Sequence, residues 1–154
     1  MINIKKNHEI LIASDHAGFE LKNQIINYYK NNLNFKDLGT DNNINSCDYP
    51  VIAEKLSILI QEKKYEFGIL ICGSGIGMSI VANKFKNIRA ALCYEPELSR
   101  LSRAHNNSNI LCLGSRFTEF EKTIKIIDNF INTEFESGRH ETRVNQILEL
   151  ENKY

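Results

Sequence analysis

The chain has 154 residues and a formal net charge of zero, with 42% hydrophobic and 25% charged residues. These values are typical of one globular domain, and we treat residues 1–154 as a single domain. The balanced charge argues against nucleic-acid or anionic-membrane binding, which needs a basic face. No apolar run approaches the roughly 20 residues of a membrane span, and the first residues lack the apolar core of a signal peptide. We therefore expect a cytoplasmic protein with no membrane contact.

Apolar runs alternate with amphipathic segments along the chain. Strands are predicted at residues 9–13, 34–38, 67–72, 88–93 and 109–113. Helices are predicted at 20–33, 51–63, 76–85, 97–104, 118–135 and from about 140 to the end. Because the strands are apolar on both faces, this alternation predicts an α/β fold in which helices cover both sides of a five-stranded parallel sheet. The last helix has no following strand to cover, so we expect it to pack on a partner subunit.

The most distinctive segment is Cys72-Gly-Ser-Gly-Ile-Gly77, between an apolar run and a helical pattern. A strand, a glycine turn and a helix N-terminus form an anion site, because backbone N–H groups and the helix dipole converge there. Cys72 at its mouth is a candidate base or nucleophile, and the alternative is a buried structural thiol. The spacing is neither a P-loop nor G-x-G-x-x-G, although Glu95, about 20 residues on, keeps a nucleotide site open. The glycines could also serve only close packing of strand and helix.

Polar residues follow several of the predicted strands. In open parallel sheets, ligands bind outside the carboxyl ends of the strands. Such ends carry Asp15-His16, Cys72 to Gly77, Tyr94-Glu95 and Gly114-Ser-Arg116. We therefore expect these segments to share one crevice. For Asp15, the alternative is to cap the following helix.

Basic side chains form another candidate group. Arg139 and Arg143 are four residues apart, so they lie on one face of a helix that begins here. Two guanidinium groups on one face suit a phosphate, and a solvated helix start is the alternative. His105-Asn106, before the last strand, is a further candidate for the site. The alternative is a surface histidine in an Asn-rich loop.

The four cysteines include no C-x-x-C pair. Cys93 and Cys112 lie in or at the ends of apolar strands, so we interpret them as core residues, and we assign no role to Cys47. Reduced thiols fit a cytoplasmic protein better than a disulfide framework. A redox-active thiol protein is disfavoured because Cys72 has no partner cysteine nearby in the sequence.

Taken in order, these residues resemble type B ribose-5-phosphate isomerases over nearly the whole chain. The motifs are Asp15-His-Ala-Gly-Phe-Glu-Leu-Lys22, Asp48-Tyr-Pro50, Cys72-Gly-Ser-Gly-Ile-Gly77 with Asn83-Lys84, Arg89-Ala90, His105-Asn106, Gly114-Ser-Arg116 and Gly138-Arg-His140 with Arg143. The resemblance implies a three-layer α/β/α Rossmann-like fold and an aldose–ketose isomerase without metal or other cofactor. It also implies a homodimer or homotetramer whose active sites are shared between subunits. The family includes galactose-6-phosphate and allose-6-phosphate isomerases, so a six-carbon substrate is the alternative.

The resemblance further implies roles for single residues. Cys72 is expected to interconvert ribose 5-phosphate and ribulose 5-phosphate, a step of the pentose phosphate pathway, by moving a proton through an enediolate. Some members use a glutamate after the glycine run, but Met78 and its neighbours offer no acid here. The enediolate oxygen is expected to be stabilised by Gly73, Ser74, Gly75, Ile76 and Gly77.

The remaining roles concern the sugar and its phosphate. His105 is expected to assist ring opening, Asp15 and Asn106 to hold hydroxyls, and Tyr49 to line the pocket. The phosphate is expected to bind His16, Arg116, Arg139 and Arg143, some of them from the neighbouring subunit. A rival hypothesis, a phosphate- or nucleotide-binding module without catalysis, leaves Cys72, Asp15 and His105 without a role.

Overall fold

A computed structural model describes residues 9–154, so the N-terminal stretch considered above for a signal peptide, residues 1–8, lies outside it. The strands are β1 (Glu9–Ser14), β2 (Asn34–Asp37), β3 (Gly68–Cys72), β4 (Ala90–Leu92) and β5 (Ile110–Gly114). They form one parallel sheet in the order β2-β1-β3-β5-β4. The predicted five-stranded parallel sheet is confirmed.

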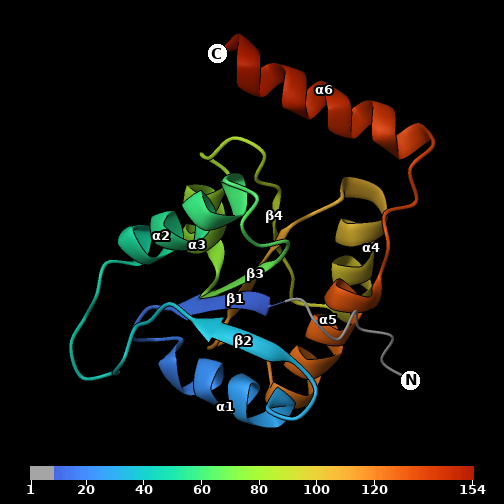
Figure 1. Cartoon of the computed structure of the whole chain (residues 1–154). Helices are drawn as coiled ribbons and strands as arrows, with labels where there is room; N and C mark the ends of the chain where they lie inside the picture. Colours follow the sequence, from blue (N-terminus) through green and yellow to red (C-terminus); the bar gives the residue numbers. More distant parts are fainter. Residues whose placement is uncertain (1–8) are drawn as a thin grey trace.

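Helices cover both faces of this sheet. They are α1 (Phe19–Tyr29), α2 (Tyr49–Gln61), α3 (Ile76–Ala82), α4 (Pro96–Asn106), α5 (Phe120–Asn132) and α6 (Arg139–Lys153). In Figure 1, α2 and α3 lie on one side of the sheet and α1 and α5 on the other, which confirms the three-layer arrangement. Within residues 9–154, no helix has both the length and the apolar character needed to cross a bilayer.

The central strand β3 anchors both helical layers. Successive side chains of a strand point to opposite faces of the sheet. Ile69 and Ile71 belong to the core cluster shared with α1 and α5, whereas Leu70 and Cys72 belong to the cluster shared with α2 and α3. All four side chains are buried. The continuous apolar run at this point of the sequence therefore reflects burial on both faces.

The two edge strands depart from the expectation of burial on both faces. Most of β2 is exposed, and β4 has three half-buried residues instead of the predicted run 88–93. An edge strand has one neighbour only, so part of its surface meets solvent. Asn83 also pairs with β4, since its side chain donates to the carbonyl of Ala90 (3.0 Å) and accepts from the Ala90 N–H (2.9 Å).

Several helix boundaries differ from the predicted ones. The helix predicted at 20–33 ends at Tyr29, because the N–H groups of Asn32 and Leu33 both donate to the Tyr29 carbonyl and turn the chain. The helix predicted at 76–85 ends at Ala82, where Asn83 leaves the helix to pair with β4. The helix predicted at 118–135 is shorter at both ends.

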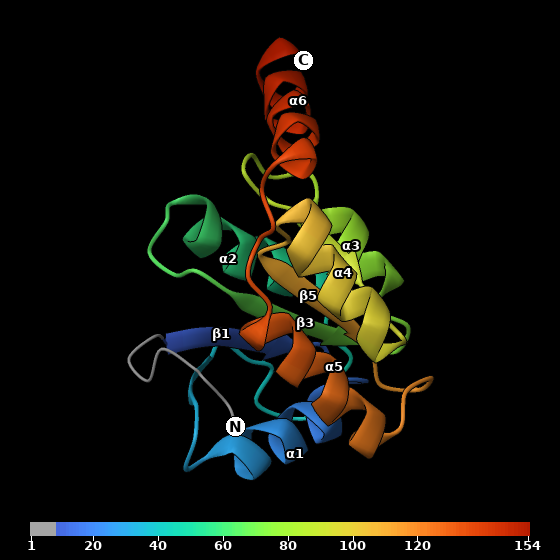
Figure 2. The ribbon, with the colours of Figure 1, turned by 90° about the vertical axis from the view of Figure 1, so that its right-hand side faces the viewer.

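The last helix, α6, stands apart from the rest of the molecule. Figures 1 and 2 show it projecting beyond the layers, reached by an extended segment after α5. Val144 is its one buried residue, and Ile147 and Leu150 are 40% and 55% exposed. A cavity of about 490 Å³ is lined by these two side chains and by Ile88. The packing of α6 on a partner subunit stays a prediction.

Candidate active site

The glycine turn after β3 encloses the thiol of Cys72. Gly75 adopts a left-handed conformation (φ 78°) at the N-terminus of α3, and its N–H donates a hydrogen bond to Cys72 Sγ (3.0 Å). A Cβ on Gly75 would lie 2.9 Å from the carbonyl of Leu113, so the turn needs glycine at this point. The Cys72 residue is 5% exposed. The turn thus fixes one sulfur atom beside a set of backbone N–H groups.

Two of those N–H groups are available to a ligand. Gly73 and Ser74 donate to no acceptor in the part of the chain that the structure describes. The Ser74 carbonyl points the other way and accepts a hydrogen bond from the Tyr94 hydroxyl (2.5 Å). Neighbouring N–H groups at a turn form a concave anion site, so this loop can hold an oxyanion. Sequence analysis placed Tyr94 in the crevice but gave it no role.

The segments at the carboxyl ends of the strands lie together. The Ser115 hydroxyl donates to the carbonyl of Ala17 (2.8 Å), and its N–H donates to the carbonyl of Cys72 (2.9 Å). A Cβ on Gly73 would lie 3.0 Å from the guanidinium group of Arg116. These contacts agree with the single crevice expected from the sequence.

Asp15, His16 and Tyr49 border the same edge of the sheet. Asp15 is buried, and its carboxylate accepts a hydrogen bond from the Gly18 N–H (3.0 Å), so it also orders the entry to α1. His16 Nδ1 accepts a hydrogen bond from the Cys47 N–H (3.3 Å). The first residue of α2, Tyr49, has its ring 2.6 Å from the position of a Cβ on Gly77.

Glu95, the acid considered for a nucleotide ribose, is paired within the chain. Its carboxylate lies 2.7 Å from the Lys122 ammonium group. Glu95 directly precedes α4 and Lys122 belongs to α5, and both exposed side chains line a cavity of about 390 Å³ together with Ser74. The nucleotide-binding interpretation therefore gains no support here.

The other predicted site residues lie at the opposite edge of the sheet. Helix α4 starts beside Tyr94 at the carboxyl edge, and its 11 residues carry the chain about 16 Å back. Asn107, directly after α4, accepts a hydrogen bond from the side chain of Arg89, the residue that precedes β4 (2.9 Å). His105 and Asn106 therefore lie at the amino edge, away from Cys72.

Within one chain, the predicted site residues thus form two groups. The carboxyl-edge group contains Asp15, His16, Tyr49, Cys72, Gly73, Ser74, Gly75, Ile76, Gly77 and Arg116. The amino-edge group contains His105, Asn106, Arg139 and Arg143. The structure brings together the members of each group and separates the two groups.

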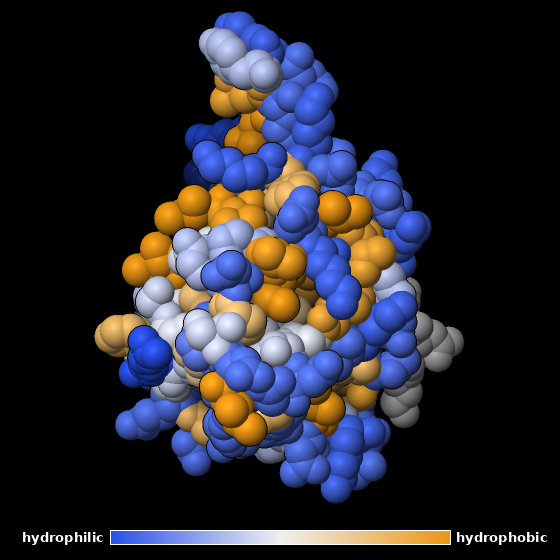
Figure 3. Space-filling model, turned by 90° about the vertical axis from the view of Figure 1, so that its left-hand side faces the viewer, coloured by the Kyte–Doolittle hydropathy of each residue, from blue (hydrophilic) through white to orange (hydrophobic). Residues whose placement is uncertain are grey.

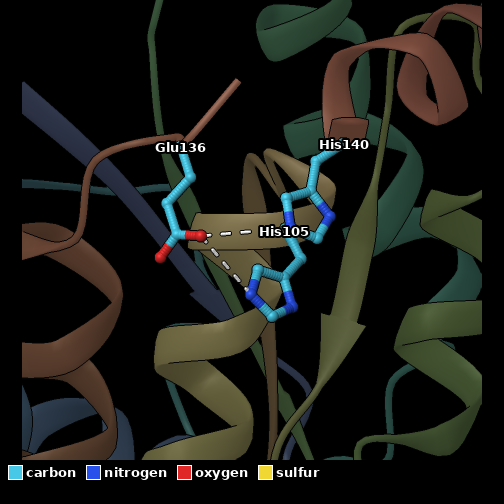
Figure 4. Close-up of side chains that lie close together, drawn as sticks. All are labelled: His105, Glu136 and His140. Atoms are coloured by element: carbon cyan, nitrogen blue, oxygen red, sulfur yellow. Dashed lines mark ion pairs between the residues drawn. The ribbon is translucent and has the colours of Figure 1, made fainter. Parts of the chain in front are cut away.

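A histidine pair dominates the amino-edge group. The rings of His105 and His140 stack with centroids 4.1 Å apart and planes 6° apart. Figure 4 shows the carboxylate of Glu136 next to both rings, with Oε2 3.6 Å from His105 Nε2 and 3.9 Å from His140 Nε2. Desolvation, His105 and Arg139 lower the pKa of His140. Sequence analysis assigned no role to His140 or Glu136. The four-residue spacing between them was the one sequence signal that could have indicated their contact.

This cluster has the donor atoms of a metal site, since one ligand atom from each of His105, Glu136 and His140 lies within 4.8 Å of the others. The surrounding charge opposes a cation. Arg139 Nε lies 3.5 Å from His140 Nε2, and Arg100 lies 3.9 Å from Glu136. Arg143, on the same helix, also lowers the pKa of His140. The cationic surroundings suit a phosphate better than a metal ion.

Comparison with known proteins identifies the family. The model of the ribose/galactose isomerase family matches residues 10–147. The chain belongs to this family.

This chain aligns with relatives from the ribose/galactose isomerase family over almost the full length of both proteins. A putative sugar phosphate isomerase of Rickettsia conorii is 48% identical, over 92% of this chain and 99% of the relative. Ribose-5-phosphate isomerase B of Escherichia coli is 38% identical, over 94% of this chain and 97% of the relative.

A solved structure of the family shows the same fold. Ribose-5-phosphate isomerase B of Mycoplasma genitalium, with bound ribulose 5-phosphate, superposes with a TM-score of 0.91 at 39% identity. The alignment covers 96% of this chain and 99% of that one. The Rossmann-like fold implied by the resemblance is confirmed.

Proposed function

We propose that this chain interconverts ribose 5-phosphate and ribulose 5-phosphate, with Cys72 as the base. The observation that carries the proposal is the Cys72 thiol, held by the Gly75 N–H (3.0 Å) inside a turn with free N–H groups. Relatives named ribose-5-phosphate isomerase B, at 38–43% identity, support the choice of substrate.

The chemistry needs a base and an oxyanion site. A hydrogen on carbon next to a carbonyl is weakly acidic, so its removal requires a placed base and stabilisation of the enediolate oxygen. Cys72 takes the proton from C2 of the open-chain aldose and returns it to C1. The N–H groups of Gly73 and Ser74 and the Ser74 hydroxyl hold the oxygen on which charge develops. Each such donor is typically worth about 10²–10³ in rate.

The phosphate lies at the far end of the substrate from the reacting carbons. His16 and Arg116 supply contacts from the carboxyl edge, and Arg139 and Arg143 supply contacts from α6. Paired guanidinium groups bind phosphate oxygens with charge-assisted hydrogen bonds. Asp15 and Asn106 hold sugar hydroxyls, and Tyr49 forms a wall.

We infer that two chains share each active site, in a homodimer or homotetramer. The groups that the reaction needs lie at opposite edges of one chain, about 16 Å apart along α4. A second copy whose α4 and α6 ends face the carboxyl edge of the first would join them. Apolar side chains of α3, which begins at that edge, offer a contact surface, including Ile76 at 50% and Ile80 at 56% exposure. Figure 3 shows several such side chains on this face. We also propose a cytoplasmic location, where the thiols of the four cysteines stay reduced.

The direct test is to incubate the purified protein with ribose 5-phosphate and to follow ketose formation. Allose 6-phosphate and galactose 6-phosphate serve as six-carbon comparisons. We expect the highest kcat/KM with ribose 5-phosphate. Faster turnover of a six-carbon sugar would reassign the substrate, and no ketose from any of the three would overturn the proposal.

A further inference from the structure

We propose that Glu136 is a positioning residue that orients His105 for opening of the sugar ring. The inference rests on the proposed function, because it concerns a step before proton transfer at Cys72. Glu136 comes from the segment between α5 and α6, which carries no residue predicted from the sequence to act in the site.

The backbone of Glu136 is fixed to the end of α4. Its N–H donates a hydrogen bond to the carbonyl of Ala104 (3.0 Å), one of the carbonyl groups that a helix leaves without an internal partner in its last turn. This bond places the Glu136 side chain next to the residue that follows Ala104, which is His105. The backbone that carries the Glu136 carboxylate is therefore held in place beside His105.

The carboxylate then selects one edge of the imidazole. Glu136 Oε2 lies 3.6 Å from His105 Nε2, and the parallel ring of His140 packs against one face of His105 at 4.1 Å. A carboxylate attracts the N–H edge of a neutral imidazole, which fixes the tautomer and turns the other nitrogen outward. His105 Nδ1 makes no hydrogen bond within residues 9–154, so it is the nitrogen left for the sugar.

Ring opening needs a group of this kind. The C1–O4 bond of the furanose breaks while the C1 carbonyl forms. The proton of the O1 hydroxyl passes to Nδ1 of His105 and from there to O4, so no net proton is gained or lost. An imidazole in the wrong tautomer would present an N–H to O1 and could not accept its proton.

A purely structural role for Glu136 predicts different behaviour. Its side chain is 52% exposed, and its other contacts are with Arg100 and His140, each at 3.9 Å. Exposed pairs of this kind contribute little to stability. Glu136→Gln keeps the backbone bond to Ala104 and nearly the same shape, so we expect the midpoint of urea unfolding to be unchanged.

The decisive experiment separates ring opening from proton transfer in Glu136→Gln. Ribulose 5-phosphate is open-chain, because the oxygen that would close a five-membered ring carries the phosphate. Exchange of its C1 hydrogen with solvent deuterium reports proton abstraction alone, because this exchange requires no ring closure. We expect isomerisation of ribose 5-phosphate to fall about tenfold, less than the roughly 10²–10⁴-fold that a placed acid or base contributes, with C1 exchange within about twofold of the unchanged protein.

Matched variants complete the test. Glu134 is exposed, lies in the same segment and makes no ion pair with any residue that the structure describes, so Glu134→Gln should leave all rates unchanged. His105→Asn should show the pattern of Glu136→Gln more strongly, and the double variant should be no slower than His105→Asn, because the two residues act as one unit. Glu136→Asp should recover part of the lost rate.

Failure of this inference and failure of the proposed function give different experimental results. An equal loss of C1 exchange, or no loss of ribose 5-phosphate isomerisation in Glu136→Gln, would overturn the inference. Absence of isomerisation in the unchanged protein would instead overturn the proposed function.

Discussion

Cys72 is the residue whose substitution tests the proposed proton transfer most directly. Cys72→Ala removes the base but leaves the residues assigned to the phosphate, so we expect kcat to fall at least about 10³-fold with little change in sugar-phosphate affinity. Isomerase assays and calorimetric titration with ribose 5-phosphate measure the two quantities. Cys47→Ala is the matched control, because the Cys47 contact to His16 is made by its backbone N–H. Near-normal turnover in Cys72→Ala would remove Cys72 from the mechanism.

Cys93 gives a prediction about stability and pH. Burial raises the pKa of its thiol from 9.0 to about 11. The folded chain therefore binds this proton more tightly than the unfolded chain, and the stabilisation is complete below pH 9 and is lost as the pH rises to 11. The contribution is about 2–3 kcal/mol.

Urea unfolding at fixed protein concentration measures this loss at pH 8 and pH 11. The free energy of unfolding should decrease with pH, and it should decrease less steeply in Cys93→Val. Burial also raises the pKa values of Cys112 and Tyr29, so the variant retains part of the slope. An identical slope in the two proteins would contradict the assignment to Cys93.

Single residues were predictable from the sequence where their chemistry depends on immediate neighbours. The glycine spacing around Cys72 indicated an anion site, and the apolar settings of Cys93 and Cys112 indicated burial, which the structure confirms. Tyr94 was assigned no role, because its hydroxyl meets the Ser74 carbonyl across 20 residues of sequence. A local pattern carries no information on such a contact.

At the level of elements, the turn between β3 and α3 has the strictest backbone requirement. Gly75→Ala would force a side chain into a left-handed conformation and place its Cβ 2.9 Å from the backbone of Leu113. We expect a loss of at least about 2 kcal/mol in the free energy of unfolding, together with loss of isomerase activity. Thermal or urea unfolding and the isomerase assay check both effects.

Gly39→Ala provides the matched comparison for this turn. Gly39 also has a positive φ (105°), but a Cβ there would meet nothing within 4 Å. It should show the conformational cost alone, about 1–2 kcal/mol. Equal destabilisation by the two substitutions would mean that the contact with Leu113 is unimportant.

The order and type of the elements followed from hydrophobic periodicity, whereas their ends did not. Strands with two buried faces read as continuous apolar runs, so β3 and β5 were recognised within one residue at each end. The ends of α1 and α3 depend on hydrogen bonds of Tyr29 and Asn83, and no repeating pattern marks those bonds. The edge position of β4 likewise follows from sheet order, which periodicity does not determine.

For the whole molecule, the division of the site between two edges leads to a complementation test. Cys72→Ala inactivates the carboxyl-edge group, and His105→Asn inactivates the amino-edge group. If sites are shared between two chains, half of randomly mixed dimers are hybrids, and each hybrid has one intact site of two. A denatured and refolded equal mixture should therefore recover about one quarter of the unchanged activity.

The control for this test is the same mixture without subunit exchange. The two variants combined without refolding should keep only their own low rates with ribose 5-phosphate for as long as their subunits do not exchange. No recovery after refolding, with oligomers present by light scattering, would indicate that each chain carries a complete site.

Shared sites were implied by the family resemblance and not by any residue pattern. The sequence identified both His105 and Cys72 as candidates but did not indicate how far apart they lie in one chain. The length and direction of α4 supply that separation, and both become known only with the fold.

Helix α6 has a consequence for the lifetime of the chain. With Val144 as its one buried side chain, little holds the helix in place on a chain that has no partner, and its backbone opens readily. Arg139 and Arg143 then become cleavage sites for a trypsin-like protease. A cut after Arg139 removes Arg143, one of the four side chains assigned to the phosphate, together with the rest of the helix. In the proposed oligomer these residues lie at a shared site, so trypsin should remove α6 from chains without a partner faster than from assembled chains.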